Sequence, residues 1–225
     1  MEDKTIKALF INGGPRRNNN TARILAKAAE GAASEGVHTE IIHLYDFRYC
    51  GCTSCFACKL KNAATDGICA VNDPLRPVLQ KAVEADIVAI GSPVYFSDIT
   101  GMTRSFIERF IFPNFSYDLD GQGRRVPPRL QKQTAMIYTM NVPEQIFGQC
   151  GYDILLGRSA KIMEQNFGSC ETLFVCDTYQ FDDYSRYAAG MFSEQDKRRH
   201  RDEHFPVDLQ RSFDLGCRLA AHAKK

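Results

Sequence analysis

The chain has 225 residues, 44% of them hydrophobic and 24% charged, which is typical of a globular protein with a full core. Its formal net charge of +1 argues against nucleic acid or an anionic membrane as the main partner. No apolar run approaches the length of a membrane span, and the first residues do not resemble a signal peptide, so we expect a cytoplasmic protein.

Short apolar segments alternate with longer amphipathic ones along most of the chain. The apolar segments predict strands that are covered on both faces, because they are continuous rather than alternating. They are Thr5–Asn12, Thr39–Leu44, Asp86–Gly91, Thr134–Met140 and Thr172–Asp177. The segments between them predict helices at Thr21–Glu35, Pro74–Ala85, Thr100–Phe110 and Tyr152–Asn166. This order predicts an α/β fold with a doubly wound, five-stranded parallel sheet.

The residues after the fifth strand predict a helical C-terminal extension. We therefore expect a main domain over residues 1–177 and an extension over residues 178–225, packed on that domain or at a subunit interface. Ser193 with Asp196 resembles a capping box that opens a charged helix, and Pro206 predicts a break before a last helix. His200 and His204 match a zinc-peptidase pattern, but a solvated helix face explains them better, since no third ligand is evident.

The first predicted strand runs into a loop rich in donors. After Gly13–Gly14–Pro15 come two arginines, three asparagines and Thr21, followed by a helix. The first-turn N–H groups of a helix have no intrahelical partner, and its dipole favours an anion there. The loop is neither a Walker loop nor a dinucleotide fingerprint. It predicts a phosphate site for a mononucleotide.

A second loop follows the third predicted strand, and it contains Pro93, Val94, Tyr95 and Phe96. In a sheet of order 2-1-3-4-5, the switch point lies between strands one and three, so both loops face one crevice. Pro93 fixes the backbone, whose N–H groups can meet the edge of a planar heterocycle, while the two aromatic rings can contact its face. A phosphate at one end and a flat ring at the other describe flavin mononucleotide (FMN).

These loops carry a family resemblance. Gly13–Thr21 resembles the phosphate loop of the flavodoxin-like NAD(P)H-dependent FMN reductases, and Gly91–Arg109 resembles their second flavin loop and the helix after it. Asp177–Tyr187 is also similar to that family. The resemblance implies a flavodoxin-like sheet of order 2-1-3-4-5. One departure is Gly14, where the family often has serine, so a backbone N–H must replace that hydroxyl contact.

Carried over by position, the resemblance implies three groups of FMN-binding residues. The phosphate would be held by Gly14, Pro15, Arg16, Asn18, Asn20 and Thr21. The ring would be held by Pro93, Val94, Tyr95, Phe96 and Gly101, and touched from its other side by Thr139, Met140 and Asn141.

Nine cysteines form the second pattern, and five of them lie between Cys50 and Cys69. Cys52, Cys55 and Cys58, with Cys69 as the fourth ligand, resemble the [4Fe–4S] motif of the iron–sulfur flavoproteins, a branch of the same superfamily. The motif there is compact, whereas here Lys59–Ile68 intervenes. The alternatives are a structural zinc site and a loop of free thiols, and the stretched spacing favours free thiols. The remaining cysteines, Cys150, Cys170, Cys176 and Cys217, predict buried core positions.

The resemblance implies an FMN-dependent oxidoreductase. It would take hydride from NAD(P)H and pass electrons to a flavin, quinone or other small acceptor, as a homodimer or larger homo-oligomer. The protein would supply position and electrostatics, and Tyr95 is the single side chain proposed for a catalytic role. Two alternatives stay open. One is an iron–sulfur flavoprotein electron carrier with a [4Fe–4S] cluster in the Cys50–Cys69 loop, and the other is a non-enzymatic flavodoxin-like binding module.

Overall fold

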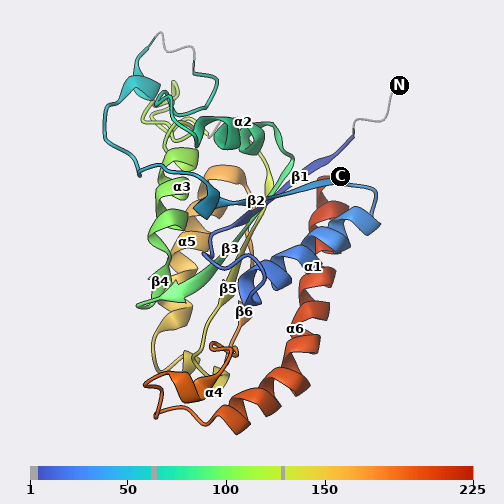
Figure 1. Cartoon of the computed structure of the whole chain (residues 1–225). Coiled ribbons are helices and arrows are strands. Elements are labelled where there is room, and N and C mark those ends of the chain that lie inside the picture. The colour runs from blue at the N-terminus through green and yellow to red at the C-terminus, as the bar shows by residue number, and fades with distance from the viewer. Residues whose placement is uncertain (1–4, 62–64, 128–129, 225) are drawn as a thin grey trace.

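A computed structural model describes residues 5–61, 65–127 and 130–224. Five parallel strands form the sheet in the order β2-β1-β3-β5-β6 (Figure 1). They are β1 (Lys7–Asn12), β2 (His38–His43), β3 (Ile87–Tyr95), β5 (Gln133–Thr139) and β6 (Glu171–Val175). The predicted parallel sheet and its winding are confirmed. The prediction ended the third strand too early, because β3 continues to Tyr95 and pairs antiparallel with a short β4 (Asp98–Ile99).

Helices cover both faces of the sheet. On one face lie α1 (Asn20–Ser34) and α6 (Glu194–Ala223), and on the other lie α2 (Arg76–Glu84), α3 (Gly101–Ile111) and α5 (Tyr152–Phe167). A single turn, α4 (Glu144–Phe147), precedes α5. All four helices predicted before the C-terminal extension are present, each with ends within two residues of those expected.

Strand geometry divides the core into two layers, because successive side chains of a strand point to opposite faces. Leu9 and Ile11 of β1 join the cluster beneath α2, α3 and α5, whereas Ala8 and Phe10 join the cluster beneath α1 and α6. All four are nearly or completely buried. A continuous apolar run is therefore needed, since both faces of the strand are covered.

The C-terminal extension corrects one prediction. Ser193 caps α6 by accepting a hydrogen bond from the Asp196 N–H, as expected, but Pro206 lies inside the helix and does not end it. Proline removes one backbone hydrogen bond, and packing on both sides of it, at Phe205 and Leu215, holds the helix together. No helix among the described residues is long and apolar enough to cross a membrane.

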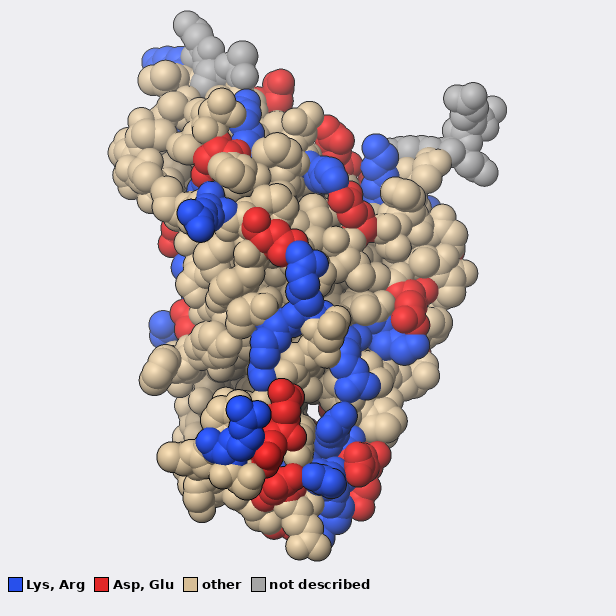
Figure 2. All heavy atoms as spheres, viewed as in Figure 1, with Lys and Arg blue, Asp and Glu red and all other residues tan. Residues whose placement is uncertain are grey.

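Close packing of α6 on α1 fixes the extension to the sheet. A Cβ at Gly216 would lie 1.9 Å from the Ala28 carbonyl oxygen, so only glycine permits this approach. The buried Ser212 hydroxyl donates to the Ile24 carbonyl, 2.7 Å away. Figure 2 shows basic and acidic side chains interspersed over the face that carries this helix pair, in keeping with the near-zero net charge.

Candidate functional site

A cleft lies at the carboxyl ends of β1, β3 and β5. In the sheet register Asn12 is paired with Gly91, and Pro93 with Thr139, so the loops that follow these residues lie side by side. From β1 the strand order runs to β2 in one direction and to β3, β5 and β6 in the other. The switch point of the sheet therefore lies at this edge. The residues that line the cleft are Gly14, Pro15, Arg16, Asn19, Asn20, Thr21, Pro93, Val94, Tyr95, Thr139, Met140, Asn141, Thr178 and Gln180.

The first loop is held in place by Asn12, which is fully buried. Its side-chain oxygen accepts the Gly14 N–H at 2.9 Å, and its amide nitrogen donates to His43 Nδ1 at 2.8 Å. The Gly14 N–H, which was expected to replace a serine contact to phosphate, therefore has an acceptor within the protein. Gly13 is required where the loop passes α3, since a Cβ there would lie 1.8 Å from the Thr103 hydroxyl.

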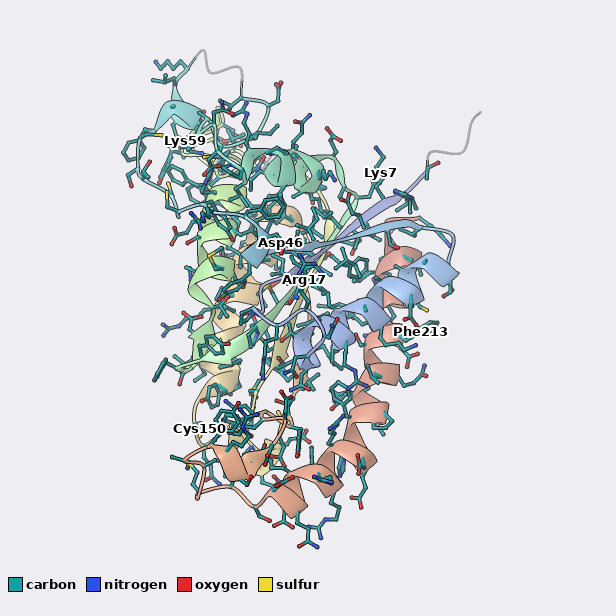
Figure 3. The ribbon with its side chains drawn as sticks, in the orientation of Figure 1. Lys7, Arg17, Asp46, Lys59, Cys150 and Phe213 are labelled. Carbon is teal, nitrogen blue, oxygen red and sulfur yellow. The ribbon has the colours of Figure 1, made fainter. Side chains whose placement is uncertain are left out.

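Thr21, Arg16 and Asn20 tie this loop to other segments. The buried Thr21 hydroxyl lies 2.7 Å from the Thr139 hydroxyl at the end of β5. Arg16 Nη1 donates to the Gln180 carbonyl at 2.8 Å, and the Asn20 amide donates to the Tyr179 carbonyl at 2.9 Å. The neighbouring Arg17 points away from the cleft and pairs with Asp46 (Figure 3).

The second loop is a β-hairpin. Phe96 and Ser97 form its tip with φ values of 49° and 67°, a conformation that pairs β3 with β4. Arg104 of α3 fixes the hairpin by donating to both carboxylate oxygens of Asp98, at 3.0 and 2.9 Å. Tyr95 borders the cleft and is 46% exposed, whereas Phe96 projects fully into solvent. In this structure Phe96 does not line the cleft, because the hairpin carries it past the rim.

Thr178 and Gln180 form a third wall of the cleft. A buried lysine of α6, Lys197, holds the loop next to this wall. The Gln180 side chain accepts from the Asn141 amide at 3.1 Å. Lys197 Nζ donates to the Asn141 carbonyl at 3.0 Å and also to its side-chain oxygen and to Asp177. The C-terminal extension thereby holds the loop after β5. Lys197 was not predicted from the sequence, because it lies in a strongly charged stretch with nothing local to mark it as buried.

The structure brings most of the predicted flavin residues together. Three do not line the cleft: Asn18 lines an adjoining pocket, Phe96 is at the hairpin tip, and Gly101 begins α3 behind the loop. Three lining residues were missed, namely Asn19, Thr178 and Gln180. Asn19 could have been found from the sequence, because its side chain caps α1 as asparagine often does.

The donors along this cleft fit FMN. One part of the lining, which we call the phosphate end, comprises the Arg16 guanidinium, the Asn19 and Asn20 amides and the start of α1, whose first turn holds no acidic residue. Such a set suits a phosphate dianion. A second part, the ring end, comprises Pro93, Val94 and Tyr95, which offer backbone and an aromatic ring to a flat heterocycle. The chemistry of these two groups matches the phosphate and the ring of the cofactor.

The pKa of His43 is lowered from its ordinary value of 6.5, chiefly by burial and then by the charge of Arg17. The folded state therefore resists protonation that the unfolded chain accepts, so this histidine removes stability as pH falls below 6.5. We expect the free energy of unfolding of the wild type to fall more than that of His43→Gln between pH 7.5 and 5.5. Urea unfolding at both pH values checks this, and a smaller fall in the wild type would contradict it.

The cysteine loop forms a separate small pocket. Its lining includes Cys52, Cys55, Cys58 and Cys69, together with Phe56 and Phe112. Cys69 is buried, Cys58 is half-buried, and Cys52 and Cys55 are exposed. Burial raises the pKa of the Cys58 thiol. No group of three or more Cys, His, Asp or Glu side chains in the described residues is arranged to hold a metal ion. The donor types suit iron or zinc, but the ligands are not preassembled.

A buried arginine supports this pocket from α3. The Arg109 guanidinium donates to both oxygens of Asp73, at 2.6 and 2.9 Å, and to the Cys50 carbonyl at 3.3 Å. These hydrogen bonds from Arg109 hold the pKa of Asp73 below its ordinary value. Arg109 also lines the pocket, and its buried Nε has no hydrogen-bond partner among the described residues. The pair orders the cysteine loop against α3.

Four cysteines lie outside the cysteine loop, and they differ in burial. Cys170, Cys176 and Cys217 are partly buried, but the prediction of a buried Cys150 is wrong, because it lies exposed in the turn before α5 (Figure 3). His200 and His204 stack at 4.3 Å on the surface of α6, and His200 faces Asp177 at 3.4 Å. They form no metal site with the described residues around them.

Two curated proteins are similar to this chain over about half of their length. An iron-sulfur flavoprotein of Archaeoglobus fulgidus is 40% identical over 104 residues, which cover 46% of this chain and 48% of that protein. An iron-sulfur flavoprotein of Methanocaldococcus jannaschii is 34% identical over 104 residues, covering 46% and 51%. The chain thus spans about half the length of these curated relatives.

Solved structures agree with the fold. An NAD(P)H:quinone oxidoreductase from Methanothermobacter marburgensis matches with a TM-score of 0.64 at 15% identity, over 96% of this chain and 97% of that one. An azoreductase from Bacillus anthracis matches with a TM-score of 0.64 at 13% identity, over 95% of this chain and 100% of that one.

The sequence model of the NADPH-dependent FMN reductase family matches residues 6–138, which include β1, β3 and both predicted flavin loops. The chain therefore belongs to the NADPH-dependent FMN reductase family.

Proposed function

We propose that the protein is an FMN-dependent oxidoreductase that takes hydride from NAD(P)H and passes electrons to a small acceptor such as a quinone, a flavin or an azo compound. The observation that supports it is the cleft at the switch point, whose lining combines a phosphate-type donor set with a ring-type wall. Bound FMN would supply the redox chemistry, accepting hydride from one substrate and delivering electrons to the next.

The side chains around the cleft would bind and orient the cofactor. Arg16, Asn20 and Thr21 would hold its phosphate, with the start of α1. Backbone N–H groups between Val94 and Phe96 would hydrogen-bond the polar edge of the ring, and the loop at Met140 would close its other side. The ring end is open to solvent beside Tyr95, which is 46% exposed, so a second substrate has access. Tyr95 remains the single candidate for a direct contact with that substrate.

The first experiment is a visible spectrum of anaerobically purified protein, before and after NADPH and, separately, NADH. We expect paired flavin bands that bleach with at least one donor. A yellow protein that neither donor bleaches would leave a flavodoxin-like binding module. A protein that stays colourless after incubation with FMN would refute the flavin site.

The pocket lined by four cysteines favours a second candidate, an iron–sulfur electron carrier. Two of the curated relatives above are named iron-sulfur flavoproteins. A cluster would be held by Cys52, Cys55, Cys58 and Cys69, provided that the exposed segment around Cys55 moves inward. Zinc, or free thiols without a metal, are the competing states of the same loop.

Metal analysis distinguishes these states. If a [4Fe–4S] cluster is present, anaerobically purified protein is expected to contain about four iron and four sulfide per chain, with broad absorbance beyond the flavin bands. Cys55→Ser should lose most of this iron. Cys150→Ser is the matched control, since that exposed thiol lies outside the loop. An iron content far below about four per chain that does not change in Cys55→Ser would exclude the cluster. About one zinc per chain would instead identify the loop as a zinc site.

A further inference from the structure

A second pocket adjoins the phosphate end of the flavin cleft. It has a volume of about 510 Å³ and shares Asn19, Asn20 and Gln180 with the cleft. Its other walls are Arg23 of α1, the segment 179–182, and Arg198, Arg201 and Asp202 of α6. We call it the arginine pocket. Neither Pro93 nor Tyr95 lines it.

Two of its arginines are held by aromatic rings and not by carboxylates. The Arg23 guanidinium lies 4.7 Å from the centre of the Phe205 ring, and that of Arg201 lies 5.2 Å from the Tyr179 ring. Neither forms an ion pair within the described part of the chain. Stacking on a ring orients a guanidinium and leaves its N–H groups available for an anion. Arg198 differs, because it pairs with Glu194 at 2.6 Å.

The remaining lining groups suit a nucleoside. Asn18, Asn19 and Asn20 present amides next to the arginines, and Asp182 and Asp202 present carboxylates. A carboxylate suits ribose hydroxyl groups, and an arginine suits a ribose phosphate, as in other dinucleotide sites. The aspartates also reduce the net positive charge, so a bare inorganic anion fits this lining less well than a phosphorylated sugar.

We propose that the arginine pocket binds the phosphorylated adenosine end of a dinucleotide. The identity of the dinucleotide rests on the proposed function. If that function holds, the dinucleotide is NADPH, with its 2′-phosphate between Arg23 and Arg201. The pocket then selects NADPH over NADH. The other source of the same chemistry is the adenosine diphosphate half of FAD, which would extend past the phosphate loop.

The test is calorimetric titration of FMN-loaded protein with 2′,5′-ADP and with 5′-ADP, for the wild type, Arg201→Gln and Arg199→Gln. Arg199 is the matched control, since it is an exposed arginine of the same helix that pairs with Asp196. We expect 2′,5′-ADP to bind more tightly than 5′-ADP, with a Kd that rises about tenfold in Arg201→Gln, as for loss of one charge-assisted contact, and does not change in Arg199→Gln.

Each outcome has one meaning. Arg201-dependent binding in which 5′-ADP matches 2′,5′-ADP supports the pocket and assigns it to an adenosine diphosphate such as that of FAD. Absence of Arg201-dependent binding by either probe overturns the proposal. FMN content is measured first and separately. A protein that cannot hold FMN but binds 2′,5′-ADP through Arg201 would refute the proposed function and leave the pocket standing.

Discussion

Arg16→Ala combined with Thr21→Ala is expected to weaken FMN binding by about two to three orders of magnitude, while the fold is kept. A hydrogen bond to a charged group such as phosphate contributes about 1.5–3 kcal/mol and a factor of ten in Kd corresponds to about 1.4 kcal/mol, so the loss of two such bonds gives an effect of this size. Both residues line the phosphate end of the cleft. Fluorescence titration of the apoprotein with FMN measures the effect, and circular dichroism monitors the fold.

Arg17→Ala is the control for this pair. Arg17 is adjacent in sequence, but it pairs with Asp46 on the surface and lies outside the cleft. An exposed ion pair contributes about 0–1 kcal/mol to stability, so this variant should bind FMN as the wild type does. If the double variant keeps its FMN affinity, or if Arg17→Ala loses it equally, the phosphate-site assignment fails.

The second large effect is expected for Lys197→Met. This buried lysine holds Asn141 at two atoms and pairs with Asp177, whose side chain is 20% exposed. Removing one partner of a buried pair leaves an uncompensated charge, and we expect a loss of about 2–4 kcal/mol in the free energy of unfolding. Because Asn141 also lines the cleft, FMN affinity should fall about tenfold in protein that is still folded. Urea unfolding and FMN titration measure the two effects.

Two further variants separate the role of Lys197 from a general effect of α6. Lys197→Arg keeps the charge and should recover part of the stability and of the affinity. Arg199→Met breaks an exposed pair two residues away, so it should cost no more than about 1 kcal/mol. If Lys197→Met loses stability while its FMN affinity is unchanged, Lys197 does not position the cleft.

The hairpin shows where local pattern was insufficient. From the sequence, the segment from Gly91 to Gly101 was expected to form one flavin loop in which both Tyr95 and Phe96 hold the ring. In the structure β3 extends to Tyr95 and reverses at Phe96 and Ser97, both with positive φ, although no glycine marks the hairpin in the sequence. Arg104 pairs with Asp98 across the turn and supports this conformation from α3. Only Tyr95 of the two aromatic residues borders the cleft.

At Pro206, too, tertiary contacts override the prediction from the local sequence. Local chemistry predicts a break there, because proline lacks an N–H. The helix continues because α6 lies along α1 and the sheet, where Phe205 and Leu215 are buried on either side of the proline. A single lost hydrogen bond costs less than giving up that packing. The sequence showed the proline but not the contacts that offset it.

By itself the sequence determined the parallel sheet, its winding and the two loops after β1 and β3. These follow from short-range features: continuous apolar runs, helical periodicity, and donors placed at strand ends. Tertiary structure alone decided the third wall at Gln180, the buried Lys197 and the arginine pocket, because each joins the C-terminal extension to residues far away in the chain. A charged residue near residue 200 looks solvated in sequence, and only folding α6 back along α1 brings it to the cleft.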